Sequence, residues 1–266
     1  MNDQSTPPAS LEQVRRQIDE IDARLIELLR ERFSASEAVK AVKAATGQDS
    51  ASPIRPAREA IVMRRLIDAC QGPLPTDLMV RLWREIITSS TLVQADASVH
   101  CTIAVMQAGR LRDLIRSHFG RIPVVEHGDD DAALKAAAHS RTAVAVTAPD
   151  GDSARFLSDG DIAQNAVIGT LPAFNADGVP QLLIIGQPFE EPTGQDETLV
   201  LTSGRLPRDF SPAPLWAVEL PSGDTLTSLP GFLSSSQTPL LDLRQRNENL
   251  ALRVLGRYPS PIRTDK

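Results

Sequence analysis

Residues 11–43 read LEQVRRQIDEIDARLIELLRERFSASEAVKAVK, and their pattern predicts one long amphipathic helix. The apolar residues alternate at intervals of three and four, which is the heptad spacing of a helix that packs along another helix. This apolar seam consists of Leu11, Val14, Ile18, Ile21, Leu25 and Leu28, and it resumes at Ala35, Val39 and Val42. Arg32 lies between the two parts, where the pattern favours an apolar residue, so its guanidinium group needs an explanation.

The long helix is predicted to extend from about Leu11 to Ala45, with Ser10 as its N-cap and Thr46–Gly47 at its end. A helix of this length is unusual in a single globular domain, and the two shorter helices expected after it cannot cover its whole seam. We therefore expect the chain to dimerise, so that the seam is buried against a second copy.

The chain before residue 96 is predicted to be helical, and the chain after it to be mixed. Two further helices are expected, at about Ala57–Ala69 and from an N-cap at Thr76 or Asp77 to about Ala95. Beyond residue 96 the pattern is βαβαβ, through CTIAVM, GRLRDLIRSHF, RIPVVEH, DDAALKAAAHS and TAVAVT. Two more strands are expected at PQLLIIGQ and ETLVLTS. We thus predict a helical domain at residues 1–96 and a small α/β domain at residues 101–266.

With 41% hydrophobic and 23% charged residues, the chain is expected to be a soluble globular protein. No apolar run reaches the roughly 20 residues of a membrane helix. The N-terminal MNDQSTPPAS lacks the basic and apolar parts of a signal peptide. Cys70 and Cys101 lack metal-ligand spacing and are expected to be reduced thiols, so we predict a cytoplasmic location.

The charge distribution argues against a nucleic-acid partner. Residues 1–95 contain 13 Lys and Arg against 13 Asp and Glu, and the rest of the chain contains 15 against 21. Neither part has the basic surplus that nucleic-acid binding usually requires. The histidines, at positions 100, 118, 127 and 139, form no ligand pattern, so we expect neither a metal nor a cofactor.

Each of the three predicted helices carries polar groups on its apolar face. Lys43 lies eleven residues after Arg32 and therefore on nearly the same face of the first helix. The corresponding faces of the other helices are Glu59, Val62, Leu66 and Ala69, and Leu78, Leu82, Ile86, Ser90 and Gln94. Burying such polar groups without partners would cost several kcal/mol, so we expect a polar ligand among them.

Each polar group also has a simpler interpretation. Arg32 would set the helix register or form a structural ion pair with Glu59. Ser90 would be a packing residue, and Gln94 and Lys43 would face solvent. The convergence of two cations, a carboxylate, a hydroxyl and an amide instead favours a small anion with more than one carboxylate. No histidine precedes residue 96, so a reaction there would rely on positioning and charge stabilisation.

Arg15 adds a geometric argument for a shared site. On one straight helix it lies roughly 25 Å from Arg32 and about 100° out of phase, so the two cannot hold one small molecule within a single chain. In an antiparallel dimer, Arg15 of one copy would approach the Arg32 end of the other.

Three fragments resemble the all-α class of chorismate mutases: VRRQIDEIDARLIELLRERFSASEAVKAVK, RPAREAIVMRRL and LWREIITSSTLVQ. The resemblance covers residues 11–94. It implies three-helix chains that dimerise, with two sites that each take one arginine from the partner. It also implies the pericyclic rearrangement of chorismate to prephenate without a cofactor, a step of phenylalanine and tyrosine biosynthesis in the shikimate pathway.

The resemblance assigns roles to individual residues. Arg15 would bind a substrate carboxylate across the dimer, Arg32 the second carboxylate, and Lys43 the ether oxygen and a carboxylate. Glu59 would bind the ring hydroxyl and Gln94 the ether oxygen. The implied catalytic groups are Arg32, Lys43, Glu59 and Gln94.

Three more positions complete the implied substrate-binding set. Arg58 would support the site electrostatically, and Ser90 would bind at or near a carboxylate. Arg55 departs from the family pattern, because the best-known bacterial member has an aspartate there that contacts the ring hydroxyl. That departure weakens the hydroxyl contact and leaves Glu59 to make it.

The distal region resembles a degenerate prephenate dehydratase, through QLLIIGQPFEEPTGQDETLVLTS, and the end of a phenylalanine-binding regulatory module, through LALRVLGRYPSP. The reactive motifs of that family are missing. Its Thr-Arg-Phe is replaced by Pro180, Gln181 and Leu182, its Gly-Pro-x-Gly-Thr by MQAGRL with only Gly109 retained, and its Glu-Asn-Ser by PDGDS. We therefore predict that this domain is non-catalytic and serves a structural, interacting or ligand-sensing role.

Three alternatives stay open on these grounds. The chain would be a bifunctional chorismate mutase/prephenate dehydratase if the distal domain had rebuilt its site. It would be a non-catalytic dimeric regulatory protein if the helices only dimerised or bound a partner enzyme. With the same fold, the substrate would be isochorismate or aminodeoxychorismate in place of chorismate.

Overall fold

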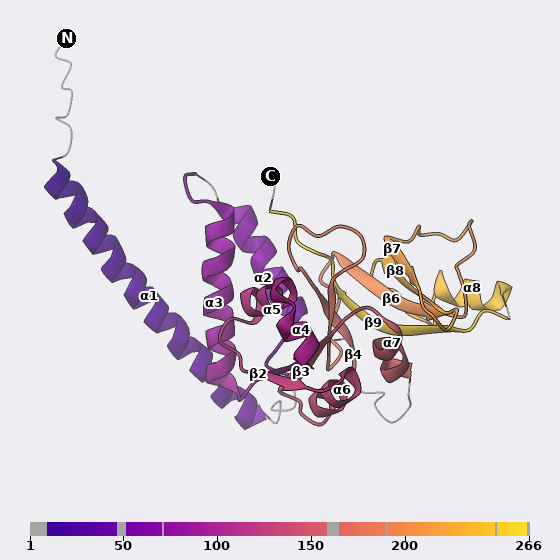
Figure 1. Ribbon diagram of the computed structural model, residues 1–266. Coiled ribbons are helices and arrows are strands. Elements are labelled where there is room, and N and C mark those ends of the chain that lie inside the picture. The colour runs from indigo at the N-terminus through magenta and orange to yellow at the C-terminus, as the bar shows by residue number, and fades with distance from the viewer. Residues whose placement is uncertain are drawn as a thin grey trace, which may run out of the picture. The chain divides into compact units, whose positions relative to one another are not determined.

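The computed structural model describes residues 10–46, 52–70, 72–158, 165–189, 191–247 and 249–264. Contacts divide the chain into two compact units, Met1–Asp49 and Ser50–Lys266. One helix makes up the described part of the first unit, and the second combines further helices with a nine-stranded sheet (Figure 1). The two helices before residue 96 are grouped with the sheet, and the division at residues 96–101 stays a prediction. No helix among the described residues is both long and apolar enough to cross a membrane.

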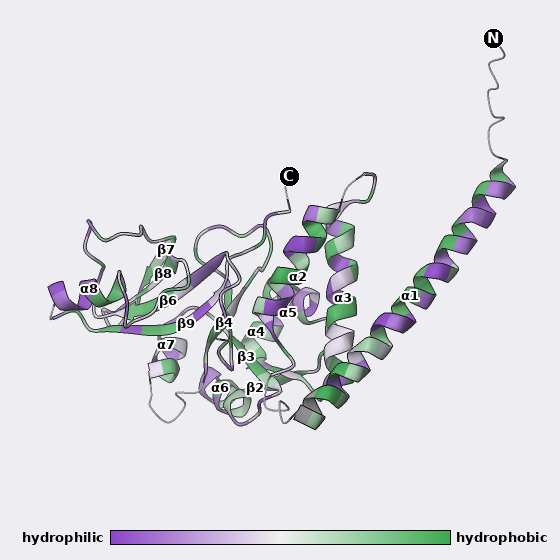
Figure 2. Cartoon of the chain, turned by 180° about the vertical axis from the view of Figure 1, so that it is seen from behind, coloured by the Kyte–Doolittle hydropathy of each residue, from purple (hydrophilic) through white to green (hydrophobic). Residues whose placement is uncertain are grey.

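The first unit is the helix α1 (Leu11–Thr46), which begins at the predicted residue. The N–H of Gln13 donates to Oγ of Ser10 at 3.2 Å, and the N–H of Ser10 donates to Oε1 of Gln13 at 2.7 Å. The predicted N-cap is therefore confirmed as part of a reciprocal capping box. The apolar seam of α1 is exposed, with Leu25 at 52% and Leu28 at 58%. Figure 2 shows apolar and polar residues alternating along this helix.

The next two helices are α2 (Pro56–Ala69) and α3 (Thr76–Gln94). The predicted N-cap of α3, at Thr76 or Asp77, is wrong by one or two residues. Pro75, with extended backbone at φ −64° and ψ 129°, is the N-cap, so the helix starts directly after it. Asp77 acts within the first turn, where its charge complements the helix dipole and pairs with Arg81 at 3.1 Å.

The most buried face of each helix differs from the predicted polar-ended face. The residues on this packed face include Ala60, Met63 and Ile67 of α2, and Met79, Val80 and Ile87 of α3. They form one core cluster with Ile262, which follows the last strand. On the predicted face of α3, Leu78 and Leu82 remain 38% and 49% exposed. Each helix therefore has two apolar sides. The sequence pattern identified the side that ends in polar residues and missed the side that is buried.

The first part of the sheet confirms the predicted βαβαβ arrangement. The parallel strands are β1 (Ser98–Thr102), β2 (Val124–His127) and β3 (Ala143–Thr147), with β1 between the other two. The intervening helices are α4 (Ile103–Gln107), α5 (Gly109–Phe119) and α6 (Asp130–Ala138). The predicted strand CTIAVM is wrong in its last four residues, which belong to α4. Thr102 ends β1, and its Oγ1 accepts the N–H of Val105 at 3.2 Å to cap α4.

Two antiparallel strands extend this part. After α7 (Gly151–Ser158), β4 (Ala166–Leu171) pairs with β5 (Leu182–Gly186), which also pairs with β3. β5 lies within the predicted strand PQLLIIGQ, whereas β4 was not predicted. Alternate residues of β5 enter two separate core clusters, so both faces of the sheet are covered.

The strands after residue 195 form the other part of the sheet. They are β6 (Asp196–Thr202), at the predicted ETLVLTS, β7 (Trp216–Glu219), β8 (Thr225–Pro230) and β9 (Leu252–Pro259), with α8 (Leu240–Arg246) before β9. Their order β9-β6-β8-β7 is that of a ferredoxin-like unit in which the proline-rich residues 203–215 replace the first helix. β9 joins the two parts by pairing Gly256 with Val167. A Cβ at position 256 would lie 2.2 Å from the Val167 carbonyl oxygen, so only glycine fits.

Candidate functional site

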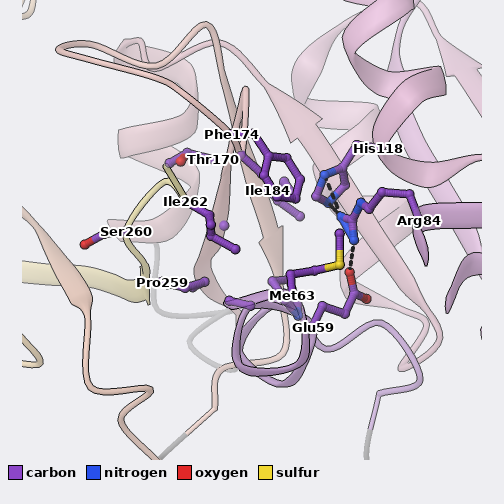
Figure 3. Close-up of a pocket in the computed structure, with 14 residues that line it drawn as sticks. Glu59, Met63, Arg84, His118, Thr170, Phe174, Ile184, Pro259, Ser260 and Ile262 are labelled. Atoms are coloured by element: carbon purple, nitrogen blue, oxygen red, sulfur yellow. Dashed lines mark hydrogen bonds and ion pairs between the residues drawn. The ribbon is translucent and has the colours of Figure 1, made fainter. Parts of the chain in front are cut away.

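Glu59 is placed in the first turn of α2, where a carboxylate also complements the helix N-terminus. Its Oε2 accepts a hydrogen bond from Nη1 of Arg84 in α3 and forms an ion pair with it (Figure 3). Both side chains are largely buried, with 15% of Glu59 and 7% of Arg84 exposed. The sequence had suggested Arg32 as a structural partner for Glu59, and within the second unit Arg84 takes that role.

Arg84 is held at its other end by His118 of α5. Nη2 of Arg84 lies 2.8 Å from Nδ1 and 2.9 Å from Nε2 of the imidazole ring. Burial, and then the charge of Arg84, place the pKa of His118 well below 6.5, so the ring is neutral near pH 7 and can accept a hydrogen bond from the guanidinium. Burial also lowers the pKa of Arg84, and Glu59 opposes that shift. We call these three side chains the Glu59–Arg84–His118 cluster.

A cavity of about 30 Å³ borders this cluster, with Met63, Phe174, Ile184 and Ile262 on its apolar side (Figure 3). Thr170 and Ser260 contribute polar groups to its wall. The space admits groups of the size of water and is too small for a dicarboxylate substrate. The cavity is therefore a small space beside the Glu59 carboxylate and not a substrate site.

A wider hollow of about 560 Å³ lies at the N-terminal end of α2 and is lined by Arg55 and Arg58, two of the predicted substrate-binding cations. Arg55 is the N-cap residue of α2 and makes no side-chain cap hydrogen bond. Phe189 and Glu191, from the segment that follows β5, border the same hollow. Its volume falls in the range of small-molecule sites.

Ser90 and Gln94 lie near the C-terminal end of α3, as predicted. Oγ of Ser90 donates to the carbonyl oxygen of Ile86 at 2.7 Å, and Nε2 of Gln94 donates to that of Ser90 at 3.2 Å. Both bonds run back along the helix, and Ser90 is buried while Gln94 is half-buried. Their proposed contacts with substrate stay predictions.

The remaining predicted residues, Arg15, Arg32 and Lys43, lie on α1 in the first unit. Arg15 is exposed and Arg32 is half-buried, and this burial lowers the pKa of Arg32. The side chain of Lys43 lies outside the described residues. The meeting of these cations with the groups on α2 and α3 in one site therefore stays a prediction.

Sequence reasoning missed Arg84 and His118. Arg84 lies on the buried stripe Val80, Arg84, Ile87 and Thr91, so it meets the criterion that singled out Arg32, a cation on an apolar face. His118 lies between the buried residues Ile115 and Phe119 on α5 and gave a weaker signal. Only the tertiary packing of α3 against α5 shows that the two side chains meet.

His118 predicts a loss of stability in mild acid. Because its pKa lies well below 6.5 in the folded chain, the unfolded chain binds the proton first as the pH falls. Its contribution to stability is therefore complete above pH 6.5 and is lost below it. Between pH 6.5 and about 5, the Tm of the wild type should fall more steeply than that of His118→Asn, whose amide does not titrate. Parallel Tm curves in calorimetry would contradict a buried neutral imidazole.

The positions of the distal motifs hold local structural groups. The N–H of Gln181 donates to the carbonyl oxygen of Leu171 at 2.9 Å, and Leu182 begins β5. Oδ1 of Asp150 accepts the N–H groups of Asp152 and Ser153, both at 3.1 Å, in the first turn of α7. The absence of dehydratase activity stays a prediction.

The helical part of the chain matches a known protein family. Residues 14–95 match the family model "Chorismate mutase type II". The bifunctional chorismate mutase/prephenate dehydratase of Pseudomonas aeruginosa is 34% identical over 91 residues, which are 34% of this chain and 25% of that protein. The protein of the same name from Neisseria gonorrhoeae is 36% identical over 85 residues, 32% of this chain and 22% of that protein. The match thus spans about a quarter of the length of these curated relatives.

Two solved structures are also similar to this chain. The prephenate dehydratase of Streptococcus mutans aligns with 63% of this chain and 99% of its own, at 10% identity and a TM-score of 0.37. That of Arthrobacter aurescens, in complex with L-Phe, aligns with 62% and 90%, at 11% identity and a TM-score of 0.33. TM-scores of this size do not establish a common fold. The family match therefore concerns residues 14–95 alone. Residues 14–95, which span most of α1 and all of α2 and α3, match the chorismate mutase type II family, and a mixed-sheet region follows them in the chain.

Proposed function

We propose that this protein is a chorismate mutase that converts chorismate to prephenate in aromatic amino acid biosynthesis. The family match of residues 14–95 carries the proposal, because it contains every residue predicted for the site, from Arg15 to Gln94. The hollow lined by Arg55 and Arg58 supports it, since two cations beside a space of substrate size suit a dianion.

The proposed reaction needs no proton transfer, which suits a helical region without histidine. Arg32, with Arg15 of the partner subunit, would hold the two substrate carboxylates and so fix the reactive conformation. As the C–O bond breaks ahead of C–C bond formation, negative charge builds up on the ether oxygen. Lys43 and Gln94 would stabilise that charge, each by about 2.7–4 kcal/mol if they act as oxyanion-hole donors do.

The other side chains would position the ring. Glu59 would accept a hydrogen bond from the ring hydroxyl, with Arg58 supporting the site electrostatically and Ser90 at or near a carboxylate. Arg55 would face the same space from the N-cap of α2, where it adds positive charge. These roles follow from the positions of the residues in the matched segment.

We further propose that the active form is a homodimer. The seam of α1 exposes large apolar residues along its whole length, from Leu11 at 67% to Val42 at 60%. On α3, Leu78 and Leu82 are also exposed on the predicted inner face. Apolar surface of this extent on helices favours association, and a two-fold dimer is the commonest closed arrangement.

The function is tested by incubating the purified chain with chorismate and identifying products by NMR. Chorismate should disappear at a rate proportional to enzyme concentration, and isochorismate and aminodeoxychorismate should be poorer substrates. A chain that consumes none of the three would favour the non-catalytic regulatory role. A preference for either alternative substrate would keep the reaction class and change the pathway.

Prephenate is expected to be the end product. Expelling the ring hydroxyl as carbon dioxide leaves requires a positioned acid, whose absence typically costs about 10²–10⁴-fold in rate. Pro180 and Gln181, at the position of the dehydratase motif, offer no acidic proton near pH 7. Phenylpyruvate should therefore appear only at the rate seen without protein. Phenylpyruvate in proportion to enzyme concentration would instead establish the bifunctional alternative.

A further inference from the structure

We infer that Arg84 and His118 are positioning residues for Glu59, so that α5, a helix of the sheet region, controls the geometry of the mutase site. The inference rests on the proposed function, because it gives Glu59 its role toward the ring hydroxyl. No residue predicted for the site lies beyond Gln94, and this linkage therefore adds a contribution from the distal part of the chain.

The guanidinium of Arg84 is held at both ends. Nη1 is bound by Glu59 from α2, and Nη2 by the imidazole of His118 from α5. Arg84 is buried from solvent, so its charge is compensated by Glu59 and its Nη2 depends on His118 for a hydrogen-bond acceptor. The carboxylate of Glu59 is consequently fixed by a chain of contacts that crosses three helices, as Figure 3 shows.

The place of His118 depends on how closely α5 approaches α3. Gly120, the C-cap of α5 at φ 53°, lies where a Cβ would be 2.6 Å from Oγ1 of Thr88, one helical turn after Arg84. A side chain at position 120 would therefore push α5 away from α3. His118 also stacks edge-on against Phe119, with ring centroids 4.7 Å apart, which fixes the imidazole.

Movement of α5 would therefore reach Glu59. Ile115 and Phe119 of α5 pack in one core cluster with Ile168 of β4 and Ile184 of β5, so α5 follows the sheet. If α5 shifts, Arg84 loses its acceptor at Nη2, and the cavity beside the cluster leaves space into which Glu59 can turn. A carboxylate displaced by about 1 Å can lower a rate substantially, because the substrate must be held in one conformation.

The test compares His118→Leu, which removes the acceptor, with His118→Asn, whose Oδ1 can take the place of Nδ1. His118→Leu should lower kcat/KM for chorismate about tenfold, and His118→Asn should restore most of it. Against a Glu59→Gln background, His118→Leu should cause little further loss. Such non-additivity identifies residues that act through one another.

Arg64→Met is the matched control. Arg64 is also a partly buried arginine that ties α2 to the sheet region, through Oγ1 of Thr193 at 2.8 Å and the carbonyl oxygens of Gln195 and Ser260 at 2.9 and 3.1 Å. None of these three hydrogen bonds involves Glu59. Its replacement should lower the Tm about as much as His118→Leu does, with kcat/KM nearly unchanged below the melting range.

A second measurement does not depend on activity. The ¹³C-carboxyl NMR signal of Glu59, identified by its loss in Glu59→Gln, should shift in His118→Leu and stay in place in Arg64→Met. An unshifted signal, or effects of His118→Leu and Glu59→Gln that simply add, would overturn the positioning role. If the wild type does not rearrange chorismate but His118→Leu still shifts the Glu59 signal, the proposed function is overturned and the linkage between His118 and Glu59 stands.

Discussion

Replacing Arg32 with alanine is expected to lower kcat/KM for chorismate by about 10²–10³-fold while leaving a folded dimer. Arg32 interrupts an apolar seam at a position where a structural helix would carry leucine. A guanidinium can hold a carboxylate with two parallel hydrogen bonds, so alanine removes both charge and orientation from the substrate. Alanine is the strongest helix former, so the substitution should leave α1 folded.

Arg30→Ala provides the matched control for Arg32→Ala. Arg30 lies two residues away on α1 and pairs with Glu27 at 3.6 Å, and 75% of its side chain is exposed. A surface pair of this kind contributes about 0–1 kcal/mol, so activity and Tm should both stay close to the wild-type values. Rate assays, circular-dichroism melts and size-exclusion chromatography on the same samples separate the outcomes. Full activity with a changed oligomeric state in Arg32→Ala would show that the arginine sets the helix register.

The long helix was predictable because its signals are local. The heptad spacing specifies the helix, and Ser10 and Gln13 lie three residues apart, within the range of a capping box. The βαβαβ pattern was predictable for the same reason, since each element carries its own period. The N-cap of α3 was misplaced because Thr76 and Asp77 are good capping residues, and the sequence does not show that Pro75 already ends the loop.

The end of the sheet was not predictable from local patterns. β8 buries Thr225, Thr227 and Ser228 together with Leu226 and Leu229, so apolar and polar residues do not alternate in the way that marks a half-buried strand. Its position is set by pairing with β6, whose register depends on residues about 30 positions away in the chain. Such long-range pairing leaves little trace in a short window of sequence.

The candidate site divides in the same way. The polar residues on apolar faces, such as Arg32 and Glu59, could be found from helical spacing alone. The partners of Glu59 could not, because Arg84 lies 25 residues and His118 59 residues further along the chain. Their contact depends on the second apolar side of α3, and that stripe contains Arg84, Thr88 and Thr91, which weaken its apolar signal.

Mixing two inactive variants, Arg15→Ala and Arg32→Ala, is expected to restore about a quarter of wild-type activity if subunits exchange at random. Each proposed site takes Arg32 from one subunit and Arg15 from the other. In a mixed dimer, one site therefore inherits both defects and the other inherits neither. When equal amounts of the two variants exchange at random, half of the dimers are mixed. Half of the sites in those mixed dimers are intact.

The double variant Arg15→Ala/Arg32→Ala supplies the control for this mixing experiment. Paired with Arg32→Ala, it forms mixed dimers in which both sites lack Arg32, so activity should not rise. Two different affinity tags, purified in sequence, establish that mixed dimers are present in both samples. If tagged mixed dimers of Arg15→Ala and Arg32→Ala are no more active than their parents, Arg15 does not act across the interface. The roughly 25 Å between the two arginines along α1 would then require a role for Arg15 outside the site that contains Arg32.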